Sequence, residues 1–385
     1  MSDRIDLTDI AVVDNHCHSV LTRQDVDPAT WRGHFTESPD PHFRAADGMH
    51  TVFYRRLVKA MAAFHGVAAT DEQVLQARSR LRSEQLVAAL LADAAIEGVV
   101  VDTGFPDPDV VLPAEAFGRL GDAQQVTLLR LEPFFEQLVV EHGSYDDLTD
   151  AVRAGLADMR ASGHAGCKSI AAYRTGLAIQ RWPEEQARTA FTAARREVTA
   201  TGTVRLGHKP LLDTLLHLAF AAAATQELPV QFHVGYGDPD VDLRTAGPLQ
   251  LREVLEDRSY RAMPVVLLHG CWPYVREGAY LASVYGNVHL DLSYAIPFLS
   301  TAEMRAMTRA AFGVAPTTKL LYSSDGVWVP ELHWLGAHAG RQVIGTVLTE
   351  MVTDGDLDPD EARWAGERVL RHNARRLYGL AGGSA

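Results

Sequence analysis

The sequence predicts a (β/α)8 barrel, because eight short apolar runs alternate with longer amphipathic stretches and no glycine-rich phosphate turn follows an early run. The runs are rich in Val, Leu and Ile, as expected of parallel strands that are buried on both faces. A doubly wound open sheet is the competing architecture, and it would favour a GxGxxG or GxxxxGKS/T turn, which the chain lacks. The predicted strands are Ile10–Asp14, Gly98–Thr103, Val126–Leu131, Gly166–Ile170, Pro229–Val234, Pro264–His269, Asn287–Ser293 and Leu320–Asp325.

Stretches between these runs carry apolar residues at helical spacing. The predicted helices include Ser83–Ile96, Leu148–Ser162, Glu184–Thr201 and Glu361–Tyr378. We expect residues 1–385 to form a single barrel domain, since barrels of this kind often exceed the length of an average domain.

Residues 19–97 form an insertion after the first strand, because one helix needs far fewer residues than this. Its second part reads as helices over Thr51–Gly66 and Asp71–Ile96. Loops that follow barrel strands lie at the catalytic face, so we expect the insertion to be a lid or cap over the site. A contact between subunits is the alternative interpretation.

Composition excludes several classes of function. The net charge of −13 is the opposite of the basic patch that nucleic acids require. The chain has three isolated cysteines, a charged N-terminal stretch and no apolar stretch of about 20 residues. We therefore expect a cytoplasmic protein that binds neither nucleic acid nor membranes. We also expect it to act on a small molecule and to form a homo-oligomer.

Titratable residues lie at the ends of five predicted strands, in the segments VVDNHCH, GCKS, VQFHVG, VVLLHG and LLYSSDG. Barrel enzymes place their catalytic groups at the carboxyl ends of the strands, and a buried polar group is costly unless it is paired. The convergence of these residues predicts a metal site. The residues are His16, His18, Lys168, His233, His269 and Asp325.

The pair His16 and His18 is the first element of this site. Residues two apart on an extended chain point to the same side, so both imidazoles can bind one cation such as zinc. Taken singly, a strand-end histidine is often a hydrogen-bonded core residue, and Asp325 in SSDGVW has the pattern of a helix N-cap. Agreement among five strand ends favours the metal site over these interpretations.

The chain resembles the amidohydrolase superfamily, and more narrowly its amidohydrolase-2 branch. It is also similar to the amidohydrolase halves of nodulin/glutamine-synthetase-like fusion proteins, although it lacks the fused glutamine-synthetase domain. The resemblance extends from residue 10 to residue 380. It rests on VVDNHCH, GCKSIAAYRTGL, PVQFHVGYGDPDVDL, VVLLHGCWPY, NVHLDLSYAIP, KLLYSSDG and RHNARRLYGL.

This resemblance implies that His16, His18 and His233 are metal ligands. It implies that Asp325 is a further ligand that also accepts a proton from water, and that His269 binds a second metal or polarises the substrate. The expected cofactor is one or two divalent ions, with Zn²⁺ favoured over Mn²⁺.

Lys168 has two interpretations. In binuclear members of the superfamily a lysine at this strand is carbamylated and bridges two metals. A free amine at Lys168 could instead bind a substrate carboxylate with Arg174, or pair with a buried acid. The loop after the fifth strand also has two interpretations. It is either a turn or the place where Tyr236, Asp238 and Asp240 hold a substrate amino group.

We therefore expect a metal-dependent amidohydrolase that cleaves a C–N amide bond in a small polar substrate, of γ-glutamyl or amino-acid type. Its catalytic residues would be Asp325, His269 and Lys168, and its substrate-binding residues Arg174, Tyr236 and Asp238. The first alternative is a metal-dependent non-oxidative decarboxylase of a small carboxylic acid. The second is a non-catalytic scaffold, which the presence of every expected ligand disfavours.

Overall fold

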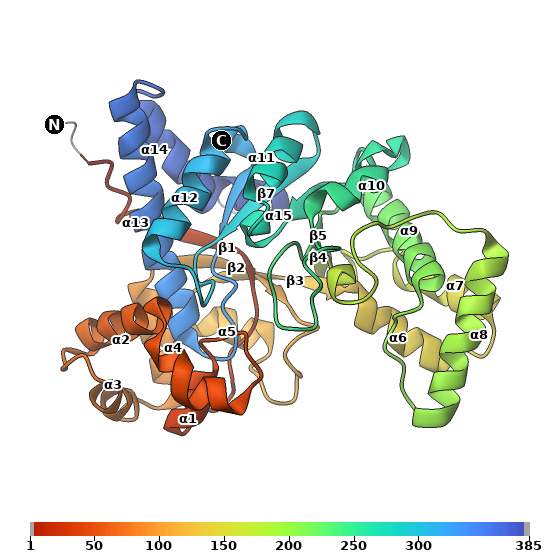
Figure 1. Cartoon of the computed structure of the whole chain (residues 1–385), viewed down its shortest axis with the longest axis horizontal. Helices are drawn as coiled ribbons and strands as arrows, with labels where there is room; N and C mark the ends of the chain where they lie inside the picture. The colour runs from red at the N-terminus through yellow and green to blue at the C-terminus, as the bar shows by residue number, and fades with distance from the viewer. Residues whose placement is uncertain (1–3, 381–385) are drawn as a thin grey trace. The chain divides into compact units, whose positions relative to one another are not determined.

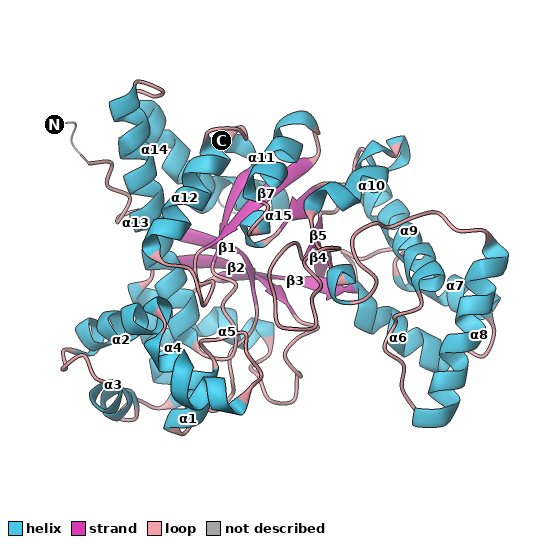
Figure 2. Cartoon of the chain, in the orientation of Figure 1, coloured by secondary structure: helices cyan, strands magenta, loops and turns pink. Residues whose placement is uncertain are grey.

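A computed structural model describes residues 4–380 of the chain. Eight strands form one sheet in the order β1-β2-β3-β4-β5-β6-β7-β8, and neighbouring strands are parallel in each pair for which the register is defined (Figure 2). The strands are β1 (Val12–Cys17), β2 (Ile96–Asp102), β3 (Gln124–Arg130), β4 (His164–Ser169), β5 (Val230–Phe232), β6 (Val265–Leu267), β7 (Val288–Ser293) and β8 (Leu320–Ser323).

The last strand also meets the first, just beyond the carboxyl ends of both. The backbone N–H of Asp325 donates to the carbonyl of His16 at 3.1 Å, and the N–H of His18 donates to the carbonyl of Gly326 at 2.8 Å. The predicted (β/α)8 barrel is therefore confirmed. Strand β1 continues to Cys17, beyond the predicted end at Asp14, because its pairing with β2 extends to Val101.

Helices fill the connections between the strands (Figure 1). The α-helices are α1 (Pro28–Gly33), α2 (Val52–His65), α3 (Asp71–Arg78), α4 (Ser83–Asp93), α5 (Ala114–Leu120), α6 (Leu131–Glu141), α7 (Tyr145–Gly155), α8 (Glu184–Thr201), α9 (Lys209–Gln226), α10 (Arg252–Glu256), α11 (Val275–Val284), α12 (Thr301–Phe312), α13 (Pro330–Asp354), α14 (Pro359–Glu367) and α15 (Asn373–Tyr378). None of the helices in residues 4–380 is long and apolar enough to cross a membrane.

Two of the predicted helices are interrupted. The stretch predicted over Asp71–Ile96 contains α3 and α4 as separate helices, because the side chain of Gln85 accepts from the backbone N–H of Arg82 at 3.1 Å and caps a new helix there. The stretch predicted over Glu361–Tyr378 contains α14, one wider π-helical turn and then α15. Apolar spacing alone does not register such breaks, because the helical period continues across them.

The chain divides into two compact units. Unit 1 consists of Met1–Val126, Gly237–Pro239 and Asp291–Ala385, and it contains β1, β2, β8 and the insertion. Unit 2 consists of Thr127–Tyr236 and Asp240–Leu290, and it contains β4, β5 and β6. Both units have apolar cores, and β1, β5 and β6 are buried along their whole length.

Within unit 1, a buried ion pair attaches the insertion to the helix that follows β8. The guanidinium of Arg78, on α3, donates to the carboxylate of Glu331, on α13, and to the side-chain oxygen of Gln24 at 2.7 Å. The indole of Trp31, on α1, donates to the same Glu331 oxygen at 3.3 Å. Two segments of the insertion therefore meet at one carboxylate, and a third, at Gln24, binds Arg78. Figure 1 shows α1 to α4 in red to orange.

This ion pair generates a prediction about stability. Replacement of Arg78 by Ala should lower the free energy of unfolding by about 3–5 kcal/mol, because it leaves Glu331 as an uncompensated buried charge. Adding Glu331→Gln to that variant should restore part of the loss. The solvent-exposed pair Arg119–Glu115 supplies the control, since Arg119→Ala should cost less than about 1 kcal/mol. Urea unfolding measures all three variants, and equal effects of Arg78→Ala and Arg119→Ala would contradict the prediction.

Candidate metal centre

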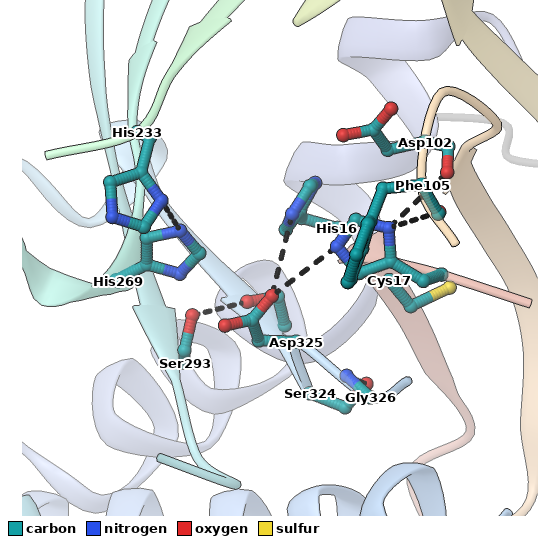
Figure 3. A network of polar contacts seen from close by, with 12 residues as sticks. His16, Cys17, Asp102, Phe105, His233, His269, Ser293, Ser324, Asp325 and Gly326 are labelled. Carbon is teal, nitrogen blue, oxygen red and sulfur yellow. Dashed lines mark hydrogen bonds and ion pairs between the residues drawn. The ribbon is translucent and has the colours of Figure 1, made fainter. Parts of the chain in front are cut away.

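The first half of the predicted site lies in unit 1, at the junction of β1 and β8. His16 is fully buried within β1, and His18 follows the strand. One carboxylate oxygen of Asp325 lies 3.4 Å from Nε2 of His16 and 3.9 Å from Nε2 of His18 (Figure 3). Donors bound to one tetrahedral zinc at about 2.0–2.2 Å lie roughly 3.3–3.6 Å apart, so these atoms fit around a cation with small adjustments.

The ring of His18 is oriented by backbone carbonyl groups. Its Nδ1 lies 2.9 Å from the carbonyl oxygen of Phe105 and 3.2 Å from that of Asp102. A carbonyl can only accept, so these contacts place the ring proton on Nδ1 and leave Nε2 as the lone-pair nitrogen that faces Asp325. Histidine ligands of metals are commonly held in this way, through a hydrogen bond from the second ring nitrogen.

Asp102 is a candidate ligand that the sequence reasoning missed. It ends β2 and is fully buried, and it forms a group with His16 and His18 whose donor atoms all lie within 4.8 Å of one another. Figure 3 shows its carboxylate on the same side as His16. The sequence carries a signal for this residue, because Asp102 ends an apolar run as Asp325 does.

A second missed residue is Glu37, in the insertion. Its side chain is half-buried, and burial raises the pKa of its carboxyl from 4.5 to about 7. The negative charges of Asp325 and Asp238 contribute to this rise, whereas Arg44 opposes it. All four residues belong to unit 1. The insertion therefore brings a carboxyl group into the electrostatic field of Asp325, and no strand-end pattern could have revealed it.

The insertion also contacts the turn that carries Asp325. The ring of His34 stacks on Trp328, with centroids 5.9 Å apart, and burial lowers the pKa of His34 to about 4. Val20 and Trp328 form an isolated parallel bridge. The insertion therefore packs against the turn that follows β8.

The second half of the predicted site lies in unit 2. His233 follows β5 and His269 follows β6, and both are buried. Nδ1 of His233 lies 3.0 Å from Nε2 of His269, and Nε2 of His233 lies 2.5 Å from the backbone carbonyl of Tyr236 (Figure 3). The carbonyl can only accept, so the proton of His233 lies on Nε2, and its Nδ1 accepts a hydrogen bond from Nε2 of His269.

Lys168 and Arg174 also lie in unit 2. Lys168 is in β4 and is only 1% exposed. The buried carboxylate of Glu132 accepts from the hydroxyl of Ser169 at 2.8 Å and from the backbone N–H of Ile170 at 2.9 Å, which holds the chain just beyond Lys168. Burial raises the pKa of Glu132.

The three predicted substrate-binding residues occupy different environments. Nε of Arg174 is 3.2 Å from the carboxylate of Glu136, so part of its charge is already balanced. The ring of Tyr236 lies 5.4 Å from that of His269. Asp238 belongs to unit 1 with Glu37, and the neighbouring Asp240 pairs with Arg205 at 3.2 Å.

The predicted residues thus form two sets, each brought together within its own unit. Unit 1 assembles a set that Asp102 and Glu37 extend. Unit 2 assembles a set around the contact between two imidazoles. The first set is His16, His18, Asp325 and Asp238, and the second is Lys168, Arg174, His233, Tyr236 and His269.

Comparison with known proteins identifies relatives of the chain. The model of the amidohydrolase family Amidohydro_2 matches residues 167–380. Protein fluG of Emericella nidulans is 36% identical over 222 residues, which cover 56% of this chain but only 25% of that protein. The chain therefore matches about a quarter of the length of this curated relative.

Solved structures of the same fold cover nearly the whole chain. A proposed metal-dependent hydrolase from Lactobacillus casei has a TM-score of 0.86 and 26% identity, and the match covers 98% of each chain. Uronate isomerase from Thermotoga maritima has a TM-score of 0.69 and 13% identity, over 96% of this chain and 95% of that one. The isomerase is similar in fold alone.

The pKa of Glu37 generates a prediction about pH. Because its folded pKa is about 7 and its ordinary value is 4.5, Glu37 favours folding while it is protonated, and this contribution is lost as the pH rises through about 7. Glu37→Gln removes the charge, so the Tm of the metal-free variant should exceed that of the wild type by a margin that grows from about pH 4.5 to about pH 7 and stays constant at higher pH. Thermal unfolding across this pH range is the measurement. The exposed Glu115→Gln is the control, and the same pH dependence in both variants would refute the assignment.

Proposed function

Because this chain belongs to the amidohydrolase family, we propose that it is a metal-dependent hydrolase that cleaves a C–N amide bond in a small polar substrate. The observation that carries the proposal is the convergence of two imidazoles on the Asp325 carboxylate, at 3.4 and 3.9 Å. Neutral imidazole nitrogens with a carboxylate are the ligand set of catalytic zinc, and manganese accepts a similar set.

The proposed ligands are His16, His18, His233 and Asp325. A bound divalent cation would polarise the substrate carbonyl and lower the pKa of water to about 7. The proposed number of ions is one or two, according to the state of Lys168. The mutual contact of His233 and His269, at 3.0 Å, leaves His233 able to turn a nitrogen lone pair to a cation if that contact opens.

The remaining chemistry falls to the side chains of this chain. Asp325 would accept a proton from the attacking water and return it to the nitrogen that leaves when the C–N bond breaks. His269 would donate a hydrogen bond to the carbonyl oxygen as negative charge develops on it. Asp325 suits the proton transfer because its side chain is 20% exposed, whereas His16 beside it is fully buried.

The proposed substrate is γ-glutamyl or amino-acid-like. Burial and then the charges of Asp325 and Asp238 raise the pKa of the Glu37 carboxyl, and the same two negative charges would favour a substrate ammonium group. Arg174 and Tyr236 are the proposed partners of the polar remainder of the substrate. Glu136 already balances part of the Arg174 charge, so Arg174 would bind through the guanidinium nitrogens other than Nε.

We further propose that the protein is a cytoplasmic homo-oligomer. Its three cysteines, Cys17, Cys167 and Cys271, are buried and not disulfide-bonded, which suits a reducing compartment. Size-exclusion chromatography with light scattering tests the oligomeric state.

Metal removal tests the function directly. Chelation should abolish the release of amine from a panel of small amides, γ-glutamyl amides among them, and zinc or manganese should restore it. Asp325→Asn should lower kcat by at least ~100-fold, because it removes the proton acceptor. His16→Ala should lose more metal than Asp325→Asn does, as measured by elemental analysis. Full turnover in metal-free protein would exclude the proposal, and release of CO2 without amine from a small carboxylic acid would establish the decarboxylase instead.

Lys168 separates a one-metal from a two-metal enzyme. A carbamate on Lys168 is negative and can bridge two cations, whereas a free ammonium would repel them. If Lys168 is carbamylated, Lys168→Ala should lose one of two bound metals and most of the activity. If Lys168 is a free amine that holds the substrate, the metal content should stay unchanged and KM should rise. We expect the free amine, and the metal content of wild type and Lys168→Ala distinguishes the two.

A further inference from the structure

A buried carboxylate in β1 binds the turn that carries Asp325. Asp14 precedes His16 by two residues and is fully buried. One of its oxygens accepts from the backbone N–H of Ser324 at 2.8 Å, and the other accepts from the hydroxyl of the same serine. Both oxygens of one charged group are thus used to hold the residue that immediately precedes Asp325.

The hydroxyl of Ser324 extends this contact past Asp325. It accepts from the backbone N–H of Gly326 at 2.8 Å. Asp14 therefore holds Ser324 directly and Gly326 through the Ser324 hydroxyl, one residue on each side of Asp325. Gly326 is required for close packing, because a Cβ there would lie 2.6 Å from the ring of His333. The side chains of Ser324 and His333 are fully buried, so solvent does not compete for these contacts.

The conformation held in this way is an uncommon one. Asp325 has φ of +55°, in the left-handed region that residues with a side chain seldom adopt. Such a conformation costs of order 1–3 kcal/mol and persists only where its surroundings determine it. Charge-assisted hydrogen bonds are the stronger class of hydrogen bond. Asp14 accepts two of them from Ser324, one from its backbone N–H and one from its hydroxyl.

We propose that Asp14 and Ser324 are positioning residues, which fix the backbone of Asp325 so that its carboxylate faces His16 and His18. The inference rests on the proposed function of Asp325 as a metal ligand and proton acceptor. Nδ1 of His333 lies 3.9 Å from the Asp14 carboxylate, which is beyond hydrogen-bond distance. Ser324 is therefore the main source of hydrogen bonds to this buried charge.

A second buried network shows why the role of Asp14 is specific. The carboxylate of Asp291 accepts from the side chain of Asn15 at 3.3 Å and from the hydroxyl of Ser293 at 2.8 Å, and Ser293 contacts the hydroxyl of Ser323 at 2.8 Å. This network links β1, β7 and β8 through their side chains. The contacts of Asp14 instead reach the backbone N–H of Ser324 directly and, through the Ser324 hydroxyl, the backbone N–H of Gly326.

Asp14→Asn is the first test, because it keeps the shape but removes the charge and one acceptor oxygen. The metal affinity of the variant should fall about 10–100-fold, as is usual when a partner of a ligand is lost, and kcat should fall with it. The cobalt-substituted variant should also show an altered ligand-field absorption spectrum, because the Asp325 carboxylate is no longer held in one orientation.

The matched control is Asp213→Asn in unit 2. Asp213 is also a fully buried carboxylate, and it accepts from the backbone N–H of Gln180 at 3.0 Å and the indole N–H of Trp182 at 2.8 Å. Asp213→Asn should lower the free energy of unfolding but leave metal affinity, the cobalt spectrum and kcat at wild-type values. A role of Asp14 in stability alone would give the same result for both variants and would overturn the proposal.

Ser324→Ala is the second variant, in case Asp14→Asn does not fold. It removes the hydroxyl that joins Asp14 to Gly326 and keeps the backbone contact between Asp14 and Ser324. It should therefore weaken metal binding, but less than Asp14→Asn does. Unchanged metal affinity and kcat in a folded Ser324→Ala protein would overturn the proposal. The wild type separates the two hypotheses, since failure of the wild type to bind metal would contradict the proposed function itself.

Discussion

The contact between the carboxyl ends of β1 and β8 is the constraint on which the candidate site depends. Two backbone hydrogen bonds join these ends, from Asp325 to His16 and from His18 to Gly326. They set the two imidazoles and the carboxylate at their observed separations, because each of the three residues takes part in this pairing. Strand pairing therefore determines the geometry of the candidate ligands as much as the identity of their side chains does.

The insertion is bound to this same end of the barrel, within unit 1. A buried ion pair joins Arg78 to Glu331 on the helix after β8, and His34 stacks on Trp328 in the turn between them. Such contacts make the environment of Asp325 depend on a segment more than 200 residues away in the sequence. The raised pKa of Glu37 is one consequence of that proximity.

The candidate residues that the sequence revealed share one property, which is their place at the end of an apolar run. His16, His233, His269 and Asp325 could be found in this way because parallel barrel strands direct their carboxyl ends to one face. Glu37 could not be found, because it follows no strand and gains its importance from burial and from neighbouring charges. Asp102 has the same strand-end signal as Asp325, so its place beside His16 and His18 could have been predicted from the sequence.

The sequence by itself determined the barrel, the order of its strands and the residues that end them, because alternating apolar runs and amphipathic stretches specify which segments must be buried. Only the tertiary structure decided how those residues are oriented. It showed that His18 is turned by two backbone carbonyls, that Asp325 adopts a left-handed backbone and that Asp14 holds the turn around it. These features arise from hydrogen bonds between residues as many as 310 positions apart, which local sequence patterns do not record.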